Sequence, residues 1–198
     1  TRDKFYNLKI NTNASLLDEK MSHAILESGV KTLAFSVDAT DNALYSKLRV
    51  NGKLENILKN IKKFQEIRTK KYSKSKIITR VSGVKVNNQQ NLNAMEKYWG
   101  DLVDQVAFVD YLPWENVYES KYSGVQTPCS DLWRRMFVWW DGKVNPCDVD
   151  YKSKLSVGNI KNSSIPELWK SDNYKKLRQR HESKLRKNTS PCNRCVLV

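Results

Sequence analysis

The chain has 198 residues and a formal net charge of +14, with 35 lysines and arginines against 21 aspartates and glutamates. Its hydrophobic content of 39% is enough for a packed core, and no apolar run approaches the roughly 20 residues that a membrane-spanning helix needs. The positive charge is spread over the polar sides of helical patterns, so it does not by itself indicate nucleic-acid binding. We therefore expect a soluble protein of one or two domains, with neither a membrane nor nucleic acid as its partner.

The first two-thirds of the chain alternates short apolar runs with helical patterns. A β-prone run ends at Asn11, and a Ser15-x-x-Asp18 signature then opens a helix that stops at Gly29. Further strands are predicted at 32–37, 77–86 and 105–111, and further helices at 54–64 and 92–99. Strands that alternate with helices predict an α/β fold with a parallel sheet.

Polar side chains gather where these strands end. They are Thr12, Asn13, Ser36, Asp38 and the residues of 87–90. Because ligands of parallel sheets bind at the carboxyl ends of the strands, these groups are candidates for hydrogen bonds to hydroxyls, carboxylates or amines of a ligand. The same residue types also cap loops through Asx turns, and the sequence leaves both interpretations open.

All four cysteines lie in the last third of the chain, at Cys129, Cys147, Cys192 and Cys195. The chain does not start with a secretory signal, so we expect a cytoplasmic protein, in which disulfides are rare. Metal ligation then explains the cluster of thiols better than disulfide bonding does. The spacing alone leaves an iron-sulfur cluster and a four-thiolate zinc ion open, although zinc ribbons usually have two close C-x2-C pairs and this chain has one.

Further regular features accompany the cysteines. A hairpin is predicted at 138–144, turning at Asp141-Gly142, five residues before Cys147. Ser164 and Glu167 form a capping box that opens a helix. The pattern Cys129-x12-Gly142-x4-Cys147, followed by this helix and by Cys192-x2-Cys195, resembles a SPASM or twitch domain, which binds auxiliary iron-sulfur clusters in radical S-adenosylmethionine (SAM) enzymes.

The first part of the chain resembles the same enzymes. Thr12-Asn13-Ala14 is similar to the T-N-G segment of their barrel, with alanine in place of the usual glycine, and the stretch from Ser36 to Arg49 is similar to their ribose-binding motif. The resemblance implies that Ser36 and Arg49 help to hold the ribose and the methionine end of SAM. The residues that it assigns to the cofactor pocket are Thr12, Asn13, Ser36, Asp38 and Arg49.

The architecture implied by the resemblance is the C-terminal part of a partial (β/α)6 radical SAM barrel over 1–124, followed by a small hairpin-plus-helix SPASM/twitch domain over 125–198. The C-x3-C-x2-C loop that binds the catalytic 4Fe-4S cluster of the family is absent from the sequence. We therefore expect the chain to be a fragment that is inactive by itself, with the catalytic cluster in a missing N-terminal part. The cysteines Cys129, Cys147, Cys192 and Cys195 are expected to hold one auxiliary 4Fe-4S cluster.

The activity implied by the resemblance is abstraction of hydrogen from a peptide or a sugar-like small molecule, leading to its oxidation or another modification. The auxiliary cluster would aid electron transfer or substrate placement, and a flavodoxin or ferredoxin would be the reductant. Asp148 would take the substrate proton, although it also suits a turn cap or a solvent-facing position. Neither His23 nor His181 is assigned a role.

The competing interpretation is of a different class. It is a non-enzymatic four-cysteine zinc module on a basic α/β scaffold that binds nucleic acid or a protein partner.

Overall fold

The computed structural model describes residues 6–111 and 117–197, and the chain divides into two compact units, residues 1–111 and 112–198. Each unit has a hydrophobic core of its own. Within the two described ranges, no helix combines the length and the apolar character that crossing a bilayer requires.

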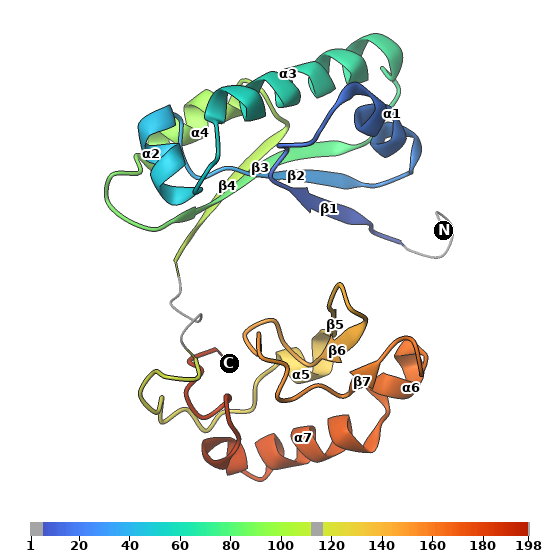
Figure 1. Ribbon diagram of the computed structural model, residues 1–198, viewed down its shortest axis with the longest axis vertical. Helices are drawn as coiled ribbons and strands as arrows, with labels where there is room; N and C mark the ends of the chain where they lie inside the picture. Colours follow the sequence, from blue (N-terminus) through green and yellow to red (C-terminus); the bar gives the residue numbers. More distant parts are fainter. Residues whose placement is uncertain (1–5, 112–116, 198) are drawn as a thin grey trace. The chain divides into compact units, whose positions relative to one another are not determined.

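The first unit is an α/β structure with a four-stranded parallel sheet in the spatial order β1-β2-β3-β4 (Figure 1). The strands are β1 (Lys9–Thr12), β2 (Thr32–Ser36), β3 (Ile78–Lys85) and β4 (Gln105–Asp110). The helices are α1 (Glu19–Glu27), α2 (Asn42–Leu48), α3 (Leu54–Lys71) and α4 (Leu92–Gly100). Helices α1, α3 and α4 lie together over one face of the sheet (Figure 1). The parallel α/β arrangement predicted from the alternation of elements is confirmed.

The core of this unit forms where α3 packs on the sheet. Every third or fourth residue of α3 is buried, which is the spacing of one helix face: Leu54, Ile57, Ile61, Phe64 and Ile67. Phe64 meets Phe35 of β2 edge to face, with ring centroids 6.1 Å apart. Burying a side chain of this size contributes about 1.5–3 kcal/mol, so this stripe anchors the helix.

Two details of the first unit differ from the sequence prediction. Helix α1 begins after Asp18, whose Oδ1 accepts a hydrogen bond from the Met21 amide at 2.7 Å. Ser15 is therefore not the cap, because its hydroxyl bonds to Asn13 instead. Helix α2 was not predicted, since its seven residues are too short to show a helical stripe; it is capped by Asp41, which accepts from the Leu44 amide at 2.8 Å.

The second unit is a small antiparallel sheet with short helices. Strands β5 (Phe137–Val138) and β6 (Lys143–Asn145) form the predicted hairpin, and β7 (Gly158–Asn159) pairs with β6. Helices α5 (Asp131–Arg134), α6 (Ile165–Trp169), α7 (Asp172–Glu182) and the 3-10 helix η2 (Leu185–Asn188) complete the unit. The capping box of Ser164 and Glu167 at the start of α6 is present as predicted.

Helix α7 closes the core of the second unit. Its buried residues Tyr174 and Leu177 pack in one cluster with Leu132, Val144 and Leu168. The compact unit begins before the boundary expected at residue 124, because its early loop is tied to its last turns. The Arg194 guanidinium donates to the Ser120 carbonyl, and the Ser123 amide donates to the Asn193 carbonyl at 3.0 Å.

Candidate functional site

Separate segments of the second unit bring the four cysteines to one small cavity. Cys129 precedes α5, Cys147 follows β6, and Cys192 and Cys195 lie in the turns after η2. None of them is in a disulfide, and each is half-buried. The remaining wall is mostly apolar and includes Leu132, Pro146, Val149, Leu155, Pro191 and Leu197. Four free thiols around one apolar cavity are a donor set for a metal or an iron-sulfur cluster.

Burial and charge repulsion keep the thiols of Cys147, Cys192 and Cys195 protonated. Burial raises the pKa of Cys147 and of Cys192 to about 12 and also raises the pKa of Cys195. Neighbouring thiolates add to the effect: Cys192 raises the pKa of Cys147, and Cys129 raises the pKa of Cys192 and Cys195. The four sulfurs are therefore within electrostatic reach of one another. A metal that binds here must displace protons, because thiolates are the ligands.

The donors surround the cavity and do not converge on one point. Within residues 6–111 and 117–197, no three His, Cys, Asp or Glu side chains form a group that could hold one metal ion. Tetrahedral zinc needs all four sulfurs at about 2.3 Å from one centre, whereas a 4Fe-4S cluster takes its cysteines at separate irons. The free volume of the cavity is about 20 Å³, which is room for about one water molecule.

Arg186 is a buried cation in the wall of this cavity, with 1% of its surface exposed. Its Nε donates to the Cys192 carbonyl at 3.2 Å, and its Nη2 donates to the carbonyls of Cys195 at 2.9 Å and Leu197 at 2.6 Å. Its Nη1 donates to the Thr127 carbonyl at 2.8 Å. One planar guanidinium therefore ties the segment before Cys129 to the turn that carries the last two cysteines.

His181 lies in the same wall and is fully buried. The Cys129 backbone amide donates to its Nδ1 at 3.2 Å, so the imidazole carries its proton on Nε2. Burial and the charge of Arg186 lower the pKa of His181 to about 4, which keeps the ring neutral at pH 7. No role was assigned to this residue from the sequence, yet it lies on the buried face of α7 with Tyr174 and Leu177. The sequence signal that could have identified His181 is its position on the apolar face of a predicted helix.

The two aspartates after Cys147 have different surroundings. Asp148, the predicted proton acceptor, is half-buried and does not line the cysteine cavity. Asp150 is fully buried, and its carboxylate accepts from the amides of Lys154 at 3.0 Å and Leu155 at 2.7 Å and from the Tyr118 hydroxyl. Asp150 therefore holds its loop together, and Asp148 is the carboxylate that remains available.

In the first unit, most of the polar residues at the strand ends bond to the protein itself. The Thr12 hydroxyl accepts from the Ala14 amide at 3.0 Å, and Asn13 Oδ1 accepts from the Ser15 amide in an Asx turn. Ala14 has a φ of 58°, the left-handed conformation that glycine adopts most readily. The loop-capping interpretation thus holds for Thr12 and Asn13.

Asp38 and Arg49 form an ion pair at the carboxyl end of β2. Arg49 Nε donates to Asp38 Oδ2 at 2.6 Å, and the Val84 amide donates to Asp38 Oδ1 at 2.8 Å. Asp38 is 5% exposed and fully engaged, whereas the Arg49 side chain is 37% exposed. Among the described residues, the two terminal nitrogens of Arg49 have no hydrogen-bond partner. Ser36 is half-buried and lies beside Ser82 in the register of β2 and β3.

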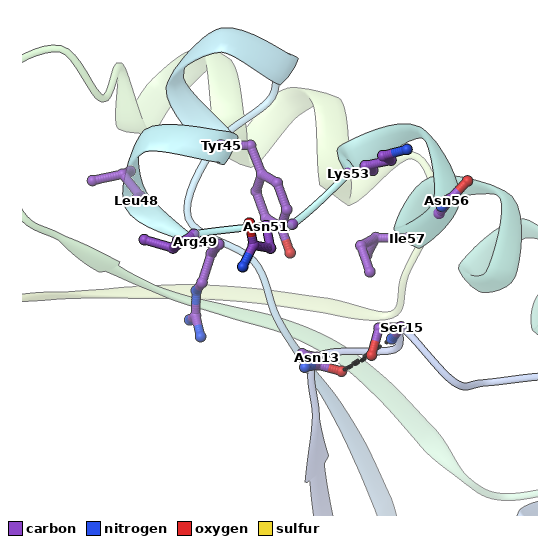
Figure 2. Close-up of a pocket in the computed structure, with 11 residues that line it drawn as sticks. Asn13, Ser15, Tyr45, Leu48, Arg49, Asn51, Lys53, Asn56 and Ile57 are labelled. Carbon is purple, nitrogen blue, oxygen red and sulfur yellow. Dashed lines mark hydrogen bonds between the residues drawn. The ribbon is translucent and has the colours of Figure 1, made fainter.

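Arg49 also lines an open pocket of about 600 Å³ (Figure 2). Figure 2 shows Tyr45, Arg49 and Asn51, from α2 and the turn after it, around the same space as Asn13 and Ser15 of the loop after β1. The pocket therefore joins two of the segments that the sequence analysis selected, through Asn13 and Arg49, whereas Ser36 and Asp38 do not line it. Its lining mixes apolar side chains with polar ones and with the cations Arg49 and Lys53, and these cations suit a ligand with a carboxylate group.

Comparisons with known proteins agree with this arrangement. Residues 129–196 match the model of the SPASM family, an iron-sulfur cluster-binding domain. No curated protein sequence matches the chain significantly. Among solved structures, the fold is similar to that of Streptococcus suis SuiB bound to precursor peptide SuiA, with a TM-score of 0.63 and 14% identity over 86% of this chain and 49% of SuiB.

Two further structures are similar. Native anSMEcpe with bound AdoMet and Kp18Cys peptide has a TM-score of 0.61 and 14% identity, covering 88% of this chain and 60% of that protein. BtrN in complex with AdoMet and 2-DOIA has a TM-score of 0.55 and 14% identity, covering 96% of this chain and 73% of BtrN. The chain thus spans about half the length of SuiB and has the fold of radical SAM enzymes that carry a SPASM domain. This confirms the predicted fold class and the predicted class of cluster-binding domain.

Proposed function

We propose that this chain, with its SPASM domain on a radical SAM fold, is the part of a radical SAM enzyme that holds an auxiliary 4Fe-4S cluster and contributes to the SAM pocket. The observation that carries the proposal is the convergence of Cys129, Cys147, Cys192 and Cys195 on one cavity. When bound, the cluster supplies one-electron transfer to or from a substrate radical, or a point at which the substrate is placed.

The residues around the cysteines would serve the cluster in two ways. The apolar wall of Leu132, Val149 and Leu155 excludes water, which strengthens every charge interaction inside the cavity. The buried guanidinium of Arg186 offsets part of the negative charge that four thiolates bring. Its hydrogen bonds also hold the backbone that carries Cys192 and Cys195.

On the SAM side, Arg49 and Ser36 would make the direct contacts. The terminal nitrogens of Arg49 can grip a carboxylate with two parallel hydrogen bonds, and Ser36 offers a hydroxyl to a ribose. Asp38 would act as a positioning residue, because its carboxylate is already taken by Arg49 and by the Val84 amide. Thr12 and Asn13 would shape the same pocket through the turn that they cap.

The reaction would begin with hydrogen abstraction from a peptide or a sugar-like small molecule and end in its oxidation or another modification. A peptide has the stronger support, because SuiB and anSMEcpe were both solved with bound peptides. The electron donor would be a small reductant such as a flavodoxin or ferredoxin. In this scheme Asp148 would accept a proton from the substrate.

The test is the metal and sulfide content of the chain after anaerobic iron-sulfide reconstitution. We expect about four irons and four sulfides per chain, because a 4Fe-4S cluster with four cysteine ligands contains that number. A variant with Cys129, Cys147, Cys192 and Cys195 all changed to alanine should bind neither. About one zinc with no sulfide would refute the proposal and support the zinc module that binds a partner.

A further inference from the structure

His181 has a buried ring nitrogen without a hydrogen-bond partner, and it lies in the wall of the cysteine cavity. Seven residues of the described ranges have a buried side-chain nitrogen or oxygen without a hydrogen-bond partner. Of these seven residues, only His181 also lines the cavity of the four cysteines. Its unpartnered atom is Nε2, and the residue is 0% exposed. Buried polar atoms without a partner are rare in folded proteins, so the atom calls for an acceptor.

The protonation of the ring decides what Nε2 can do. Since the Cys129 amide donates to Nδ1, that nitrogen supplies a lone pair and Nε2 carries the hydrogen. A nitrogen that carries a hydrogen has no lone pair in the ring plane for a metal. His181 is therefore a hydrogen-bond donor toward the cavity and not a fifth ligand.

The neighbours of His181 do not satisfy this donor. Arg186, in the same wall, offers only hydrogens, and four of its five are already bonded to carbonyls. Leu132, Val149 and Leu155 are apolar. Asp131 also lines the cavity, and its Oδ1 is paired with Arg134 at 3.0 Å and with Arg135 at 3.3 Å. The other side-chain acceptors that the cavity wall offers to Nε2 are the cysteine sulfurs, which accept hydrogen bonds best when they are negatively charged.

We propose that His181 is a positioning residue that donates its Nε2 hydrogen to a sulfur of the cluster held by Cys129, Cys147, Cys192 and Cys195. The inference rests on the proposed function. A thiolate and an inorganic sulfide are the same kind of acceptor for this bond. Because a hydrogen bond to sulfur stabilises the more negative, reduced cluster, His181 raises the reduction potential of the cluster.

Two amide variants distinguish the contribution of Nδ1 as an acceptor from that of Nε2 as a donor. His181→Asn places an amide oxygen near the position of Nδ1, so the Cys129 amide keeps an acceptor while the donor at Nε2 is lost. His181→Gln places an amide NH₂ near the position of Nε2, so the donor toward the cavity is kept and the acceptor at Nδ1 is lost. The measurement is the reduction potential of the reconstituted cluster in the full chain, by redox titration followed by electron paramagnetic resonance.

We expect His181→Asn to shift the potential to a more negative value and His181→Gln to stay near the parent protein. If His181 only caps the Cys129 amide, the order is reversed: Asn keeps the parent potential and Gln shifts it. A reversed order, or equal shifts in both variants, overturns the inference. If the parent chain takes up no iron and sulfide at all, the proposed function has failed, and that result is visible before any potential is measured.

A second measurement does not depend on whether the His181 variants assemble a cluster. The chain has two histidines, so His23→Gln leaves His181 as the single histidine. With ¹⁵N-labelled histidine in this background, pulsed electron paramagnetic resonance of the reduced cluster should detect a ¹⁵N coupling through the hydrogen bond. A cluster without that coupling rules out the contact.

Discussion

Asp148 and Asp150 show how two similar side chains in one loop come to differ. Asp150 is buried and accepts hydrogen bonds from two backbone amides and a tyrosine, so its carboxylate is committed to the loop. Asp148 is half-buried and has no hydrogen-bond partner among the described residues. A general base must have a free lone pair toward its substrate. Of the two carboxylates, Asp148 is the one that could serve the proposed proton transfer.

The first prediction concerns Asp148→Asn, tested in a full-length enzyme that includes the part that binds the catalytic 4Fe-4S cluster. We expect loss of product, with SAM cleavage in the absence of substrate unchanged, because the amide cannot accept the substrate proton. Product and 5'-deoxyadenosine are quantified by mass spectrometry. An iron content equal to that of the parent serves as the folding control. Product formation at the parent rate would remove Asp148 from the mechanism.

Asp104 illustrates a carboxylate that stabilises the first unit. Burial by itself raises its pKa, but the Thr79 amide at 2.7 Å, the Arg68 guanidinium at 2.8 Å and the Thr79 hydroxyl at 2.8 Å bring the net pKa below the ordinary value. A pKa that is lower in the folded state than in the unfolded state stabilises the fold above the unfolded-state pKa. This stability is lost as the pH falls through the folded-state pKa.

The second prediction follows from the lowered pKa of Asp104. Asp104→Asn should lower the melting temperature at pH 7, and the difference from the parent should shrink as the pH is lowered below about 4, the usual aspartate range. The side chain is 39% exposed, so solvent screening keeps the effect modest. Thermal unfolding by circular dichroism at a series of pH values measures it, with exposed Asp101→Asn as the control. A difference that stays constant with pH would refute the ion-pair explanation.

At the scale of elements, the β5–β6 hairpin depends on the conformation of Gly142. Its φ is +87°, and a Cβ at this position would lie 2.7 Å from Asn159 Oδ1. Asn159 cannot move away freely, because its Nδ2 donates to the Asp141 carbonyl and its Oδ1 accepts from the Lys161 amide. The residue is therefore constrained by both backbone strain and a fixed neighbour. Cys147 follows the second strand of this hairpin.

The third prediction is that Gly142→Ala destabilises the second unit by about 1–2 kcal/mol from the left-handed conformation, and by more from the contact with Asn159. Iron uptake should fall with it. Gly124→Ala is the matched control, since Gly124 also has a positive φ, +69°, but no atom lies within 4 Å of the position that its new methyl group would take. Unfolding in denaturant compares the two variants. Equal losses would show that the contact with Asn159 is unimportant.

Elements with a strong local pattern were predictable from the sequence, and those without one were not. The stripe of α3, the Asp141-Gly142 turn and the capping box at Ser164 each depend on residues a few positions apart. Helix α2 is too short to show such a pattern. The roles of His181 and Arg186 depend on contacts with Cys129 and Thr127, far away in the chain. Periodicity carries no information about such contacts.

At the scale of the whole molecule, the two units have separate cores, and the four cysteines belong to only one of them. Metal binding contributes directly to the stability of the structure that holds the ligands. Loading the cluster should therefore stabilise one unit without changing the other.

The fourth prediction uses amide hydrogen exchange to test this independence. Reconstitution with iron and sulfide should slow exchange in β6, α7 and η2 and leave β2, β3 and α3 unchanged. The variant with all four cysteines changed to alanine, treated in the same way, should show no slowing in either unit. Slower exchange in β2 or β3 after reconstitution would mean that the two units are energetically coupled.

The placement of the cysteines affects how a cluster-loaded domain would lose its cluster. A cluster on Cys129, Cys147, Cys192 and Cys195 closes long loops in the chain, and these loops stay closed for as long as the sulfur–iron bonds last. Once a sulfur–iron bond breaks, the freed thiolate can take up a proton, and an opening that releases iron is irreversible unless iron and sulfide are supplied again. The stability of the cluster-loaded domain is then kinetic, because its lifetime depends on the rate at which the first sulfur–iron bond breaks. Its apparent melting temperature should therefore rise with the heating rate.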